Sequence, residues 1–297
     1  MKTGDGDGRR QPCYIAFMNT FGERLAVRVT EVGSPICVGL DPHLERLPLP
    51  LQGLPPWVAA EKFCLGVIDE AASLAAAVKP QVAFFEALGW RGVAALETVV
   101  AAARSRGLLV ILDAKRGDIG STARAYVRGT LADEGPLGAD AVTLSPYLGE
   151  ESLQPFVETC DSGKGLFVLV RTSNPGSLSW QEPVAPRIAE WIRAQNEQFG
   201  ADLGPIGAVV GATIPEGGGP WREALPRGWF LIPGYGAQGA TADDLVAFFR
   251  PDGLGGLVNA SRGVLFGAEP EDESWSVKVR ERILEFHRDI RRVSSGA

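Results

Sequence analysis

The sequence predicts an α/β protein, specifically a (β/α)8 TIM barrel with an additional N-terminal helix. Short apolar runs alternate with helix-like stretches about eight times along the chain, and such alternation gives parallel strands joined by right-handed crossovers. Polar residues follow many of the apolar runs, whereas an open doubly wound sheet would gather them at one switch point. No Gly-x-Gly-x-x-Gly pattern follows the first run. A closed barrel is therefore favoured over the open sheet.

The eight expected strands are short apolar runs bounded by glycine, proline or charged residues, a pattern typical of buried parallel strands. They lie at residues 36–40, 75–79, 108–113, 139–144, 166–170, 206–211, 229–232 and 255–259. The stretches between and after them carry apolar residues at helical spacing. These helices are expected at residues 57–72, 86–105, 121–134, 151–159, 184–199, 215–225, 242–250 and 275–292.

An additional helix is expected before the first strand. Apolar residues recur every four positions from Phe17 to Val29, so residues 17–32 should form a helix that packs on the body of the barrel. Residues 1–13 begin with a run of glycine and charged residues, and we expect a disordered leader there. No low-complexity linker divides the remainder, so residues 14–297 are expected to form a single barrel domain.

The composition restricts the partners of this chain. Its 297 residues carry a net charge of −7 and have a pI near 5.1, so a nucleic acid would be repelled and is not expected as a partner. No run reaches the roughly 18 apolar residues of a membrane helix, and the N-terminus lacks the apolar core of a signal peptide. Neither membrane insertion nor export is therefore expected.

The cysteines and histidines are few and scattered. There is no Cys-x-x-Cys pair among the four cysteines, which are Cys13, Cys37, Cys64 and Cys160. We expect them to be reduced and mostly buried, which indicates a cytoplasmic protein. With only two histidines in the chain, a histidine-rich metal site is not expected.

The most informative segment places two carboxylates around one lysine, directly behind the apolar run at residues 108–112. Asp113 and Lys115 fall on the same side of the strand because side chains alternate with a period of two, and Asp118 falls on the turn or helix start beyond. In a barrel this end of a strand is where catalytic residues lie. The alternative is a solvated helix start in which Asp118 favours the helix dipole.

Other strand ends also carry polar residues that a ligand would use. Asp41 follows the first strand, Lys79 ends the second, and Ser145 follows the fourth. Each of these residues alone could be a turn former or a surface charge. Their convergence at one end of a barrel is what favours an active site.

Two glycine-rich loops follow the seventh and eighth strands, where barrels often bind phosphate. The first, residues 232–239, contains Pro233, Tyr235 and Gln238, and the second contains Arg262. Glycines let backbone N–H groups approach phosphate oxygens, and an arginine supplies charge. We therefore predict that Tyr235, Gln238 and Arg262 bind a phosphate. The alternative is that these glycines only form turns.

The run from Asp113 to Thr122 reads Asp-x-Lys-x-x-Asp-Ile-x-x-Thr. Together with the other strand ends, it closely resembles the orotidine 5'-phosphate decarboxylase family, and the resemblance covers about residues 17–266. Residues 171–176, residues 211–216 and the Gly-Tyr-Gly-Ala-Gln loop look like the longer bacterial subfamily, type 2. The resemblance implies decarboxylation of orotidine 5'-monophosphate to uridine 5'-monophosphate (UMP), the last step of de novo UMP synthesis, with no cofactor and no metal.

The resemblance also implies roles for individual residues. Asp41 and Lys79 would bind the ribose hydroxyls, with Lys79 also bridging toward Asp113, and Ser145 would contact the pyrimidine. Asp113 and Lys115 would face the reacting carbon.

Asp118 and Thr122 would be supplied across the interface of a homodimer into the partner's site. Because they are four residues apart, one helical turn presents both on one face. Binding energy from a remote phosphate can hold a mobile loop shut and exclude water, and this gating role is expected for the loop at residues 235–239.

The residue types fit such a reaction. Loss of CO2 from C6 of a pyrimidine leaves a carbanion that must be stabilised electrostatically and then protonated. Lys115, held between Asp113 and Asp118, should stay an ammonium group because nearby carboxylates favour its charged form, and it can then act as a general acid. Fixed charges in a dry site stabilise the carbanion without reorganising. A carboxylate beside the substrate carboxylate would in addition raise the ground-state energy.

Two other functions remain open. A sister decarboxylase or aldolase of the same barrel group would act on a ketosugar phosphate with a divalent metal. It is disfavoured because Lys79 is followed by proline and glutamine rather than by an added carboxylate. A non-catalytic nucleotide sensor could keep the barrel and the anion loops, but it would not need a lysine between two acids.

Overall fold

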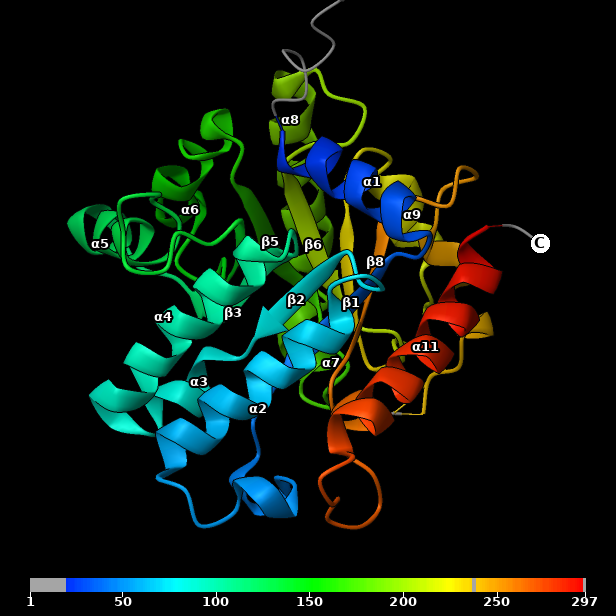
Figure 1. Cartoon of the computed structure of the whole chain (residues 1–297). Coiled ribbons are helices and arrows are strands. Elements are labelled where there is room, and N and C mark those ends of the chain that lie inside the picture. Colours follow the sequence, from blue (N-terminus) through cyan, green and yellow to red (C-terminus); the bar gives the residue numbers. More distant parts are fainter. Residues whose placement is uncertain (1–19, 237–238, 296–297) are drawn as a thin grey trace, which may run out of the picture.

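The computed structural model describes residues 20–236 and 239–295. Eight parallel strands close into one barrel in chain order (Figure 1), and β8 pairs with β1. The strands are β1 (Ile36–Leu40), β2 (Ala77–Pro80), β3 (Leu109–Arg116), β4 (Ala141–Leu144), β5 (Gly165–Arg171), β6 (Ile206–Val210), β7 (Phe230–Pro233) and β8 (Gly256–Ala260). The predicted (β/α)8 barrel is confirmed.

Helices surround the barrel; most of them connect successive strands, and α11 follows the last strand. They are α2 (Pro56–Ala71), α4 (Gly89–Ser105), α5 (Gly120–Thr130), α6 (Glu150–Val157), α8 (Ala185–Phe199), α9 (Gly219–Ala224) and α11 (Trp275–Ser294). Figure 1 shows α2 and α11 side by side on the outside of the barrel, and the two helices pack against each other. Among the described residues, no helix combines the length and the apolar character needed to cross a membrane.

Two predicted helices differ in detail from the structure. The helix expected at residues 86–105 is present as α4, but it begins at Gly89 and is preceded by a short helix that was not predicted, α3 (Val82–Glu86). Gly89 adopts a left-handed φ of 68°, which separates the two helices. The stretch at residues 242–250 forms a 3-10 helix, η5 (Asp243–Phe248). Pro251 follows it closely, and a residue before proline avoids the helical conformation.

Several short elements were not predicted because they are too brief to show a period. They are η2 (Leu44–Arg46), η3 (Leu49–Leu51), η4 (Cys160–Ser162), α7 (Ser177–Gln181) and α10 (Arg262–Leu265). The last of these carries a predicted phosphate ligand at its first residue.

The strands bury both of their faces, in two separate apolar layers. Val38, Val78 and Val110 pack outward against the helices. Their neighbours Cys37 and Ala77 belong to the cluster that fills the barrel. This alternation follows from the period of two along a strand, and it assigns each strand residue to the inside or the outside of the barrel.

The additional helix α1 (Phe21–Val32) closes the end of the barrel where the strands begin (Figure 1). Phe21 packs edge-on against Phe167 of β5, with ring centroids 5.9 Å apart, and the indole of Trp229 donates to the carbonyl of Gly22. The predicted start of this helix at residue 17 and the predicted leader, residues 1–13, lie outside the described residues.

Candidate active site

The period of two brings polar side chains together at the carboxyl end of the barrel. Ala77 and Ile111 belong to the apolar cluster inside the barrel. Lys79 and Asp113 lie two residues further along the same strands and therefore also face inward. Asp41 continues β1 in the same way. A charged layer thus sits directly above the apolar filling, at the end where barrels place their chemistry.

Asp113 lies between two lysines. Its Oδ2 accepts from Nζ of Lys79 at 2.7 Å, and its Oδ1 accepts from Nζ of Lys115 at 2.5 Å. Lys79 and Asp113 are buried, whereas 46% of the Lys115 side chain is exposed. One ammonium group is thus held inside the barrel and the other stands at its mouth.

The charges of this cluster stabilise one another. Burial would raise the pKa of the Asp113 carboxyl, but Lys79 and Lys115 outweigh burial and hold that pKa well below its usual range. Burial would lower the pKa of Lys79, but the carboxylates of Asp113 and Asp41 outweigh it and raise that pKa. At neutral pH the pair is therefore an ion pair, with Asp113 unprotonated.

Six of the predicted site residues line one cavity of about 190 Å³ at this end of the barrel. They are Asp41, Lys79, Asp113, Pro233, Tyr235 and Arg262. The Oδ1 atom of Asp41 is buried and has no hydrogen-bond partner among the described residues. A buried acceptor without a partner is costly, so this oxygen is suited to a donor from a ligand.

Four other predicted residues, all of them described, do not line this cavity: Lys115, Asp118, Thr122 and Ser145. Lys115 reaches it through Asp113, and Ser145 follows β4 with its N–H donating to the carbonyl of Arg116. Asp118 makes no ion pair with Lys115 within this chain, because its Oδ1 instead accepts from the N–H of Ile119. The expectation that Asp118 holds Lys115 therefore does not apply within one described chain.

The predictions for Thr122 and Gln238 are not tested by this cavity. Thr122 is exposed on the first turn of α5. Gln238 lies outside the described residues, so its predicted contact with a phosphate stays a prediction.

Tyr235 is held against the outer helix α11. Its hydroxyl donates to Oδ2 of Asp289 at 2.7 Å, and its ring stacks on Phe286 with centroids 5.0 Å apart. Burial and the bond to Asp289 raise the pKa of the Tyr235 phenol, so the proton stays on its oxygen. The hydroxyl is thus bonded to Asp289, and the residue also lines the cavity.

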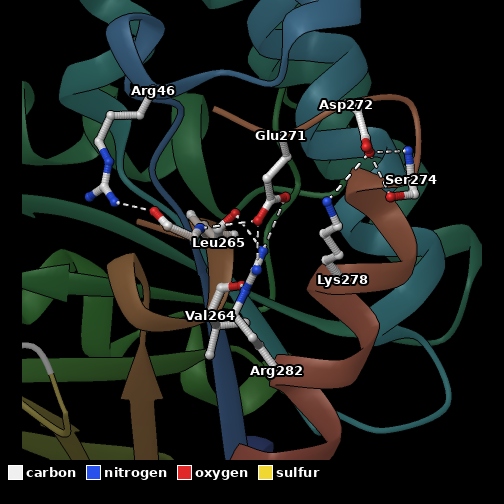
Figure 2. A network of polar contacts seen from close by, with 9 residues as sticks. Arg46, Val264, Leu265, Glu271, Asp272, Ser274, Lys278 and Arg282 are labelled. Atoms are coloured by element: carbon white, nitrogen blue, oxygen red, sulfur yellow. Dashed lines mark hydrogen bonds and ion pairs between the residues drawn. The ribbon is translucent and has the colours of Figure 1, made fainter. Parts of the chain in front are cut away.

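Arg262 is exposed and begins the short helix α10, which is held from behind by Arg282 of α11 (Figure 2). The guanidinium of Arg282 donates to the carbonyls of Val264 and Leu265 at 2.8 and 3.3 Å. It also pairs with Glu271 at 2.7 Å (Figure 2). This network satisfies carbonyls of a helix too short to bond them internally, and so fixes the segment that carries Arg262.

Two inward residues of the site were not predicted, Thr143 on β4 and Asn259 on β8. Thr143 is 1% exposed, and Oγ1 of Thr143 lies 3.1 Å from Oδ1 of Asp113. Asn259 lines the cavity, and its buried Oδ1 has no partner among the described residues. A polar residue within an apolar strand was the available signal, since such a residue needs a partner inside the barrel.

Among the described residues, no group of three or more His, Cys, Asp or Glu side chains is arranged to hold a metal ion. Cys37, Cys64 and Cys160 are free and buried, as predicted. Burial raises the pKa of Cys37 to about 12, so this thiol inside the barrel is a poor nucleophile at neutral pH.

The fold and the site define a (β/α)8-barrel protein with a cluster of charged side chains at the carboxyl ends of its strands. The family model described as Orotidine 5'-phosphate decarboxylase / HUMPS family matches residues 34–275. The chain belongs to this family.

Curated relatives and solved structures agree with this assignment. Orotidine 5'-phosphate decarboxylase of Rhodopirellula baltica is 44% identical over 92% of this chain and 100% of its own length. That of Streptomyces coelicolor is 46% identical over 84% of this chain and 90% of its own. The crystal structure of a putative orotidine 5'-phosphate decarboxylase from Streptomyces avermitilis superposes with a TM-score of 0.82 and 40% identity, covering 94% of this chain and 97% of that one.

Proposed function

We propose that this chain decarboxylates orotidine 5'-monophosphate to UMP, the last step of de novo UMP synthesis, with Lys115 as the proton donor. The observation that carries the proposal is the ammonium group of Lys115, 2.5 Å from Asp113 at the mouth of the barrel. Membership of the decarboxylase family and the names of the relatives support the reaction.

The reaction breaks the bond between C6 and the carboxylate carbon, and the electron pair stays on C6. That pair has no adjacent carbonyl that could fully accept its charge. An ammonium group fixed beside C6 stabilises the developing charge without reorganising, and then transfers a proton to the carbon. Lys115 becomes neutral in this step and must regain its proton from solvent before the next turnover.

Asp113 has two roles in this proposal. It orients the ammonium group of Lys115, and its own charge is balanced from below by Lys79 at 2.7 Å. It also lies beside the position proposed for the substrate carboxylate. Repulsion there would be relieved as CO2 leaves, but we assign the larger effect to stabilisation of the carbanion.

The ribose would lie over the inner part of the cavity. The buried oxygens of Asp41 and Asn259 both need donors, and the 2'- and 3'-hydroxyls of a ribose are donors. Lys79 lines the same cavity and would complete the contact. Ser145, at the end of β4, would contact the pyrimidine.

The phosphate would lie at the loops after β7 and β8. Arg262 supplies a positive charge there, and it lines the cavity together with Pro233 and Tyr235. Gln238 is assigned to the same contact. Closure of the loop after β7 over the phosphate would exclude water from the site. Binding of the phosphate, which is remote from C6, would then also increase the rate of decarboxylation.

We also propose that the protein is a cytoplasmic homodimer in which residues 14–297 form one domain and each subunit donates Asp118 and Thr122 to its partner. The exposed apolar side chains of Ile119 and Tyr147, next to the ends of β3 and β4, support an interface at this end. A second carboxylate for Lys115 would then come from the partner subunit.

The direct test is release of CO2 from orotidine 5'-monophosphate by the purified chain, followed together with formation of UMP. Turnover that persists in EDTA would exclude the alternative of a metal-dependent decarboxylase or aldolase acting on a ketosugar phosphate. UMP binding without any release of CO2 would instead support a nucleotide sensor.

A further inference from the structure

Strand β3 is irregular where it carries the catalytic lysine. On the β4 side its register changes between Leu112 and Arg116, so that four steps along β3 correspond to two steps along β4, from Val142 to Leu144. Lys115 has a φ of 46° and is the only non-glycine with a positive φ among the described residues. A side chain disfavours this left-handed conformation, so the surroundings must hold it in place.

The hydroxyl of Thr143 occupies the place where the two backbones separate. Its Oγ1 accepts from the N–H of Ala114 at 3.0 Å and from the N–H of Lys115 at 2.9 Å. Thr143 is 1% exposed. If that oxygen were removed, the N–H groups of Ala114 and Lys115 would lose their hydrogen bonds to it. A buried N–H group without an acceptor lowers the stability of the folded state.

The same hydroxyl also reaches the charged cluster. Its proton has two acceptors within range, Oδ1 of Asp113 at 3.1 Å and the carbonyl of Leu112 at 3.5 Å. The closer and charged acceptor is favoured. Oδ1 of Asp113 is also the oxygen that binds Nζ of Lys115. Thr143 therefore bonds both to the backbone of Lys115 and to the carboxylate that orients its side chain.

We propose that Thr143 is a positioning residue for the proton donor. It holds the left-handed backbone of Lys115 and the Oδ1 atom of Asp113 at once, which fixes where the ammonium group meets the substrate. It is two residues before Ser145 and does not line the cavity, so it acts through Asp113 and Lys115. The inference rests on the proposed decarboxylation.

The test compares Thr143→Val, which keeps the shape and removes the hydroxyl, with Thr143→Ser, which keeps the hydroxyl. For Thr143→Val we expect kcat to fall about 100-fold, the cost typical of a catalytic group misplaced by about 1 Å. Affinity for UMP, measured by calorimetry, should stay within about threefold, because no ligand contact is lost. Thr143→Ser should keep kcat within about fivefold of the unchanged protein.

Thr130→Val is the matched control, because Thr130 is also buried and its hydroxyl bonds only to the carbonyl of Tyr126 in its own helix. It should leave kcat unchanged. A folded Thr143→Val protein with kcat within about threefold of the unchanged one would overturn the inference, as would equal losses of kcat and UMP affinity.

If Thr143→Val does not fold, Thr143→Cys decides, because a thiol is a weak donor and acceptor of similar size. Its kcat should lie well below that of Thr143→Ser, and equal values would refute the role of the hydroxyl. If the unchanged chain releases no CO2 from orotidine 5'-monophosphate, the proposed function itself fails. The two failures are thus distinguishable.

Discussion

Lys115 and Asp113 lie two residues apart on strand β3, with Nζ of the lysine 2.5 Å from Oδ1 of the aspartate. The proposed proton donor and the carboxylate proposed to orient it are therefore fixed by one segment of backbone rather than by two separate loops. The second lysine, Lys79, comes from the neighbouring strand and binds the other oxygen of Asp113. Any change in the backbone of β3 should affect donor and carboxylate together.

Replacement of Lys115 by alanine should abolish decarboxylation while binding of UMP stays measurable. The proton donor is lost, but the cavity that would hold the ribose and the phosphate is kept. We expect kcat to fall at least 1,000-fold, near the upper range for a general acid combined with charge stabilisation. Lys278→Ala is the matched control, because 41% of the Lys278 side chain is exposed and its one ion pair among the described residues is with Asp272, outside the site. Turnover above about a thousandth of the unchanged rate would refute the assignment.

Arg262→Ala should raise KM strongly and lower kcat/KM. A charge-assisted bond to a phosphate contributes about 1.5–3 kcal/mol, which corresponds to roughly 10- to 100-fold in KM. Free guanidinium ion added to the assay should restore part of the activity, because it can supply the positive charge that the variant lacks. Arg288→Ala, at an exposed arginine of α11, should have no such effect. An unchanged KM would remove Arg262 from the phosphate site.

Asp113→Asn should destabilise the fold in a pH-dependent way. Lys79 and Lys115 overcome the effect of burial and lower the pKa of Asp113, so its ionised form stabilises the folded state. That contribution is fully present above the unfolded pKa of about 3.9 and is lost as pH falls toward the lower folded pKa.

Removal of the carboxylate also leaves the buried ammonium of Lys79 without its partner, at a cost of about 3–5 kcal/mol in the free energy of unfolding at pH 7. Urea unfolding at several pH values measures this difference. We expect the gap between the two proteins to narrow below pH 4. A gap that is constant from pH 7 to the acid limit would contradict the assigned pKa direction.

Arg282→Ala should weaken binding of substrate, although Arg282 itself does not line the cavity. The variant removes the donors that hold the carbonyls of Val264 and Leu265, so the helix that begins at Arg262 loses its support. KM should rise about 3- to 10-fold with kcat within about twofold, a smaller effect than that of Arg262→Ala. Arg280→Ala is the control, because that partly exposed side chain lies on the same helix and contacts Glu70 instead. A KM equal to that of the control would show that the network is not coupled to the site.

A mixture of two inactive variants tests the shared site. In a homodimer that exchanges subunits, Lys115→Ala mixed with Asp118→Ala forms mixed dimers in which one of the two sites has both side chains. With random exchange in a 1:1 mixture, about a quarter of all sites should be active. No recovery after demonstrated exchange would place Asp118 in the site of its own subunit.

Much of the fold could be predicted because barrel strands are short, apolar and regularly spaced. The strand at residues 206–211, for example, matches β6 (Ile206–Val210) to within one residue. The helix expected at residues 86–105 begins three residues later, at Gly89, because the left-handed turn there depends on a backbone angle that periodicity does not report. The helix at residues 242–250 was too short to distinguish an α-helix from a 3-10 helix.

The alternation of side chains along each strand was enough to predict that Asp41, Lys79 and Asp113 meet at one end of the barrel. Alternation and strand order can be read from the sequence itself. The role of Thr143 could not be predicted in this way. It depends on the register between β3 and β4, which brings its hydroxyl to two N–H groups that the regular ladder would otherwise bond. Register is set by packing of the whole barrel, so only the tertiary structure could decide how the Lys115 ammonium group is held.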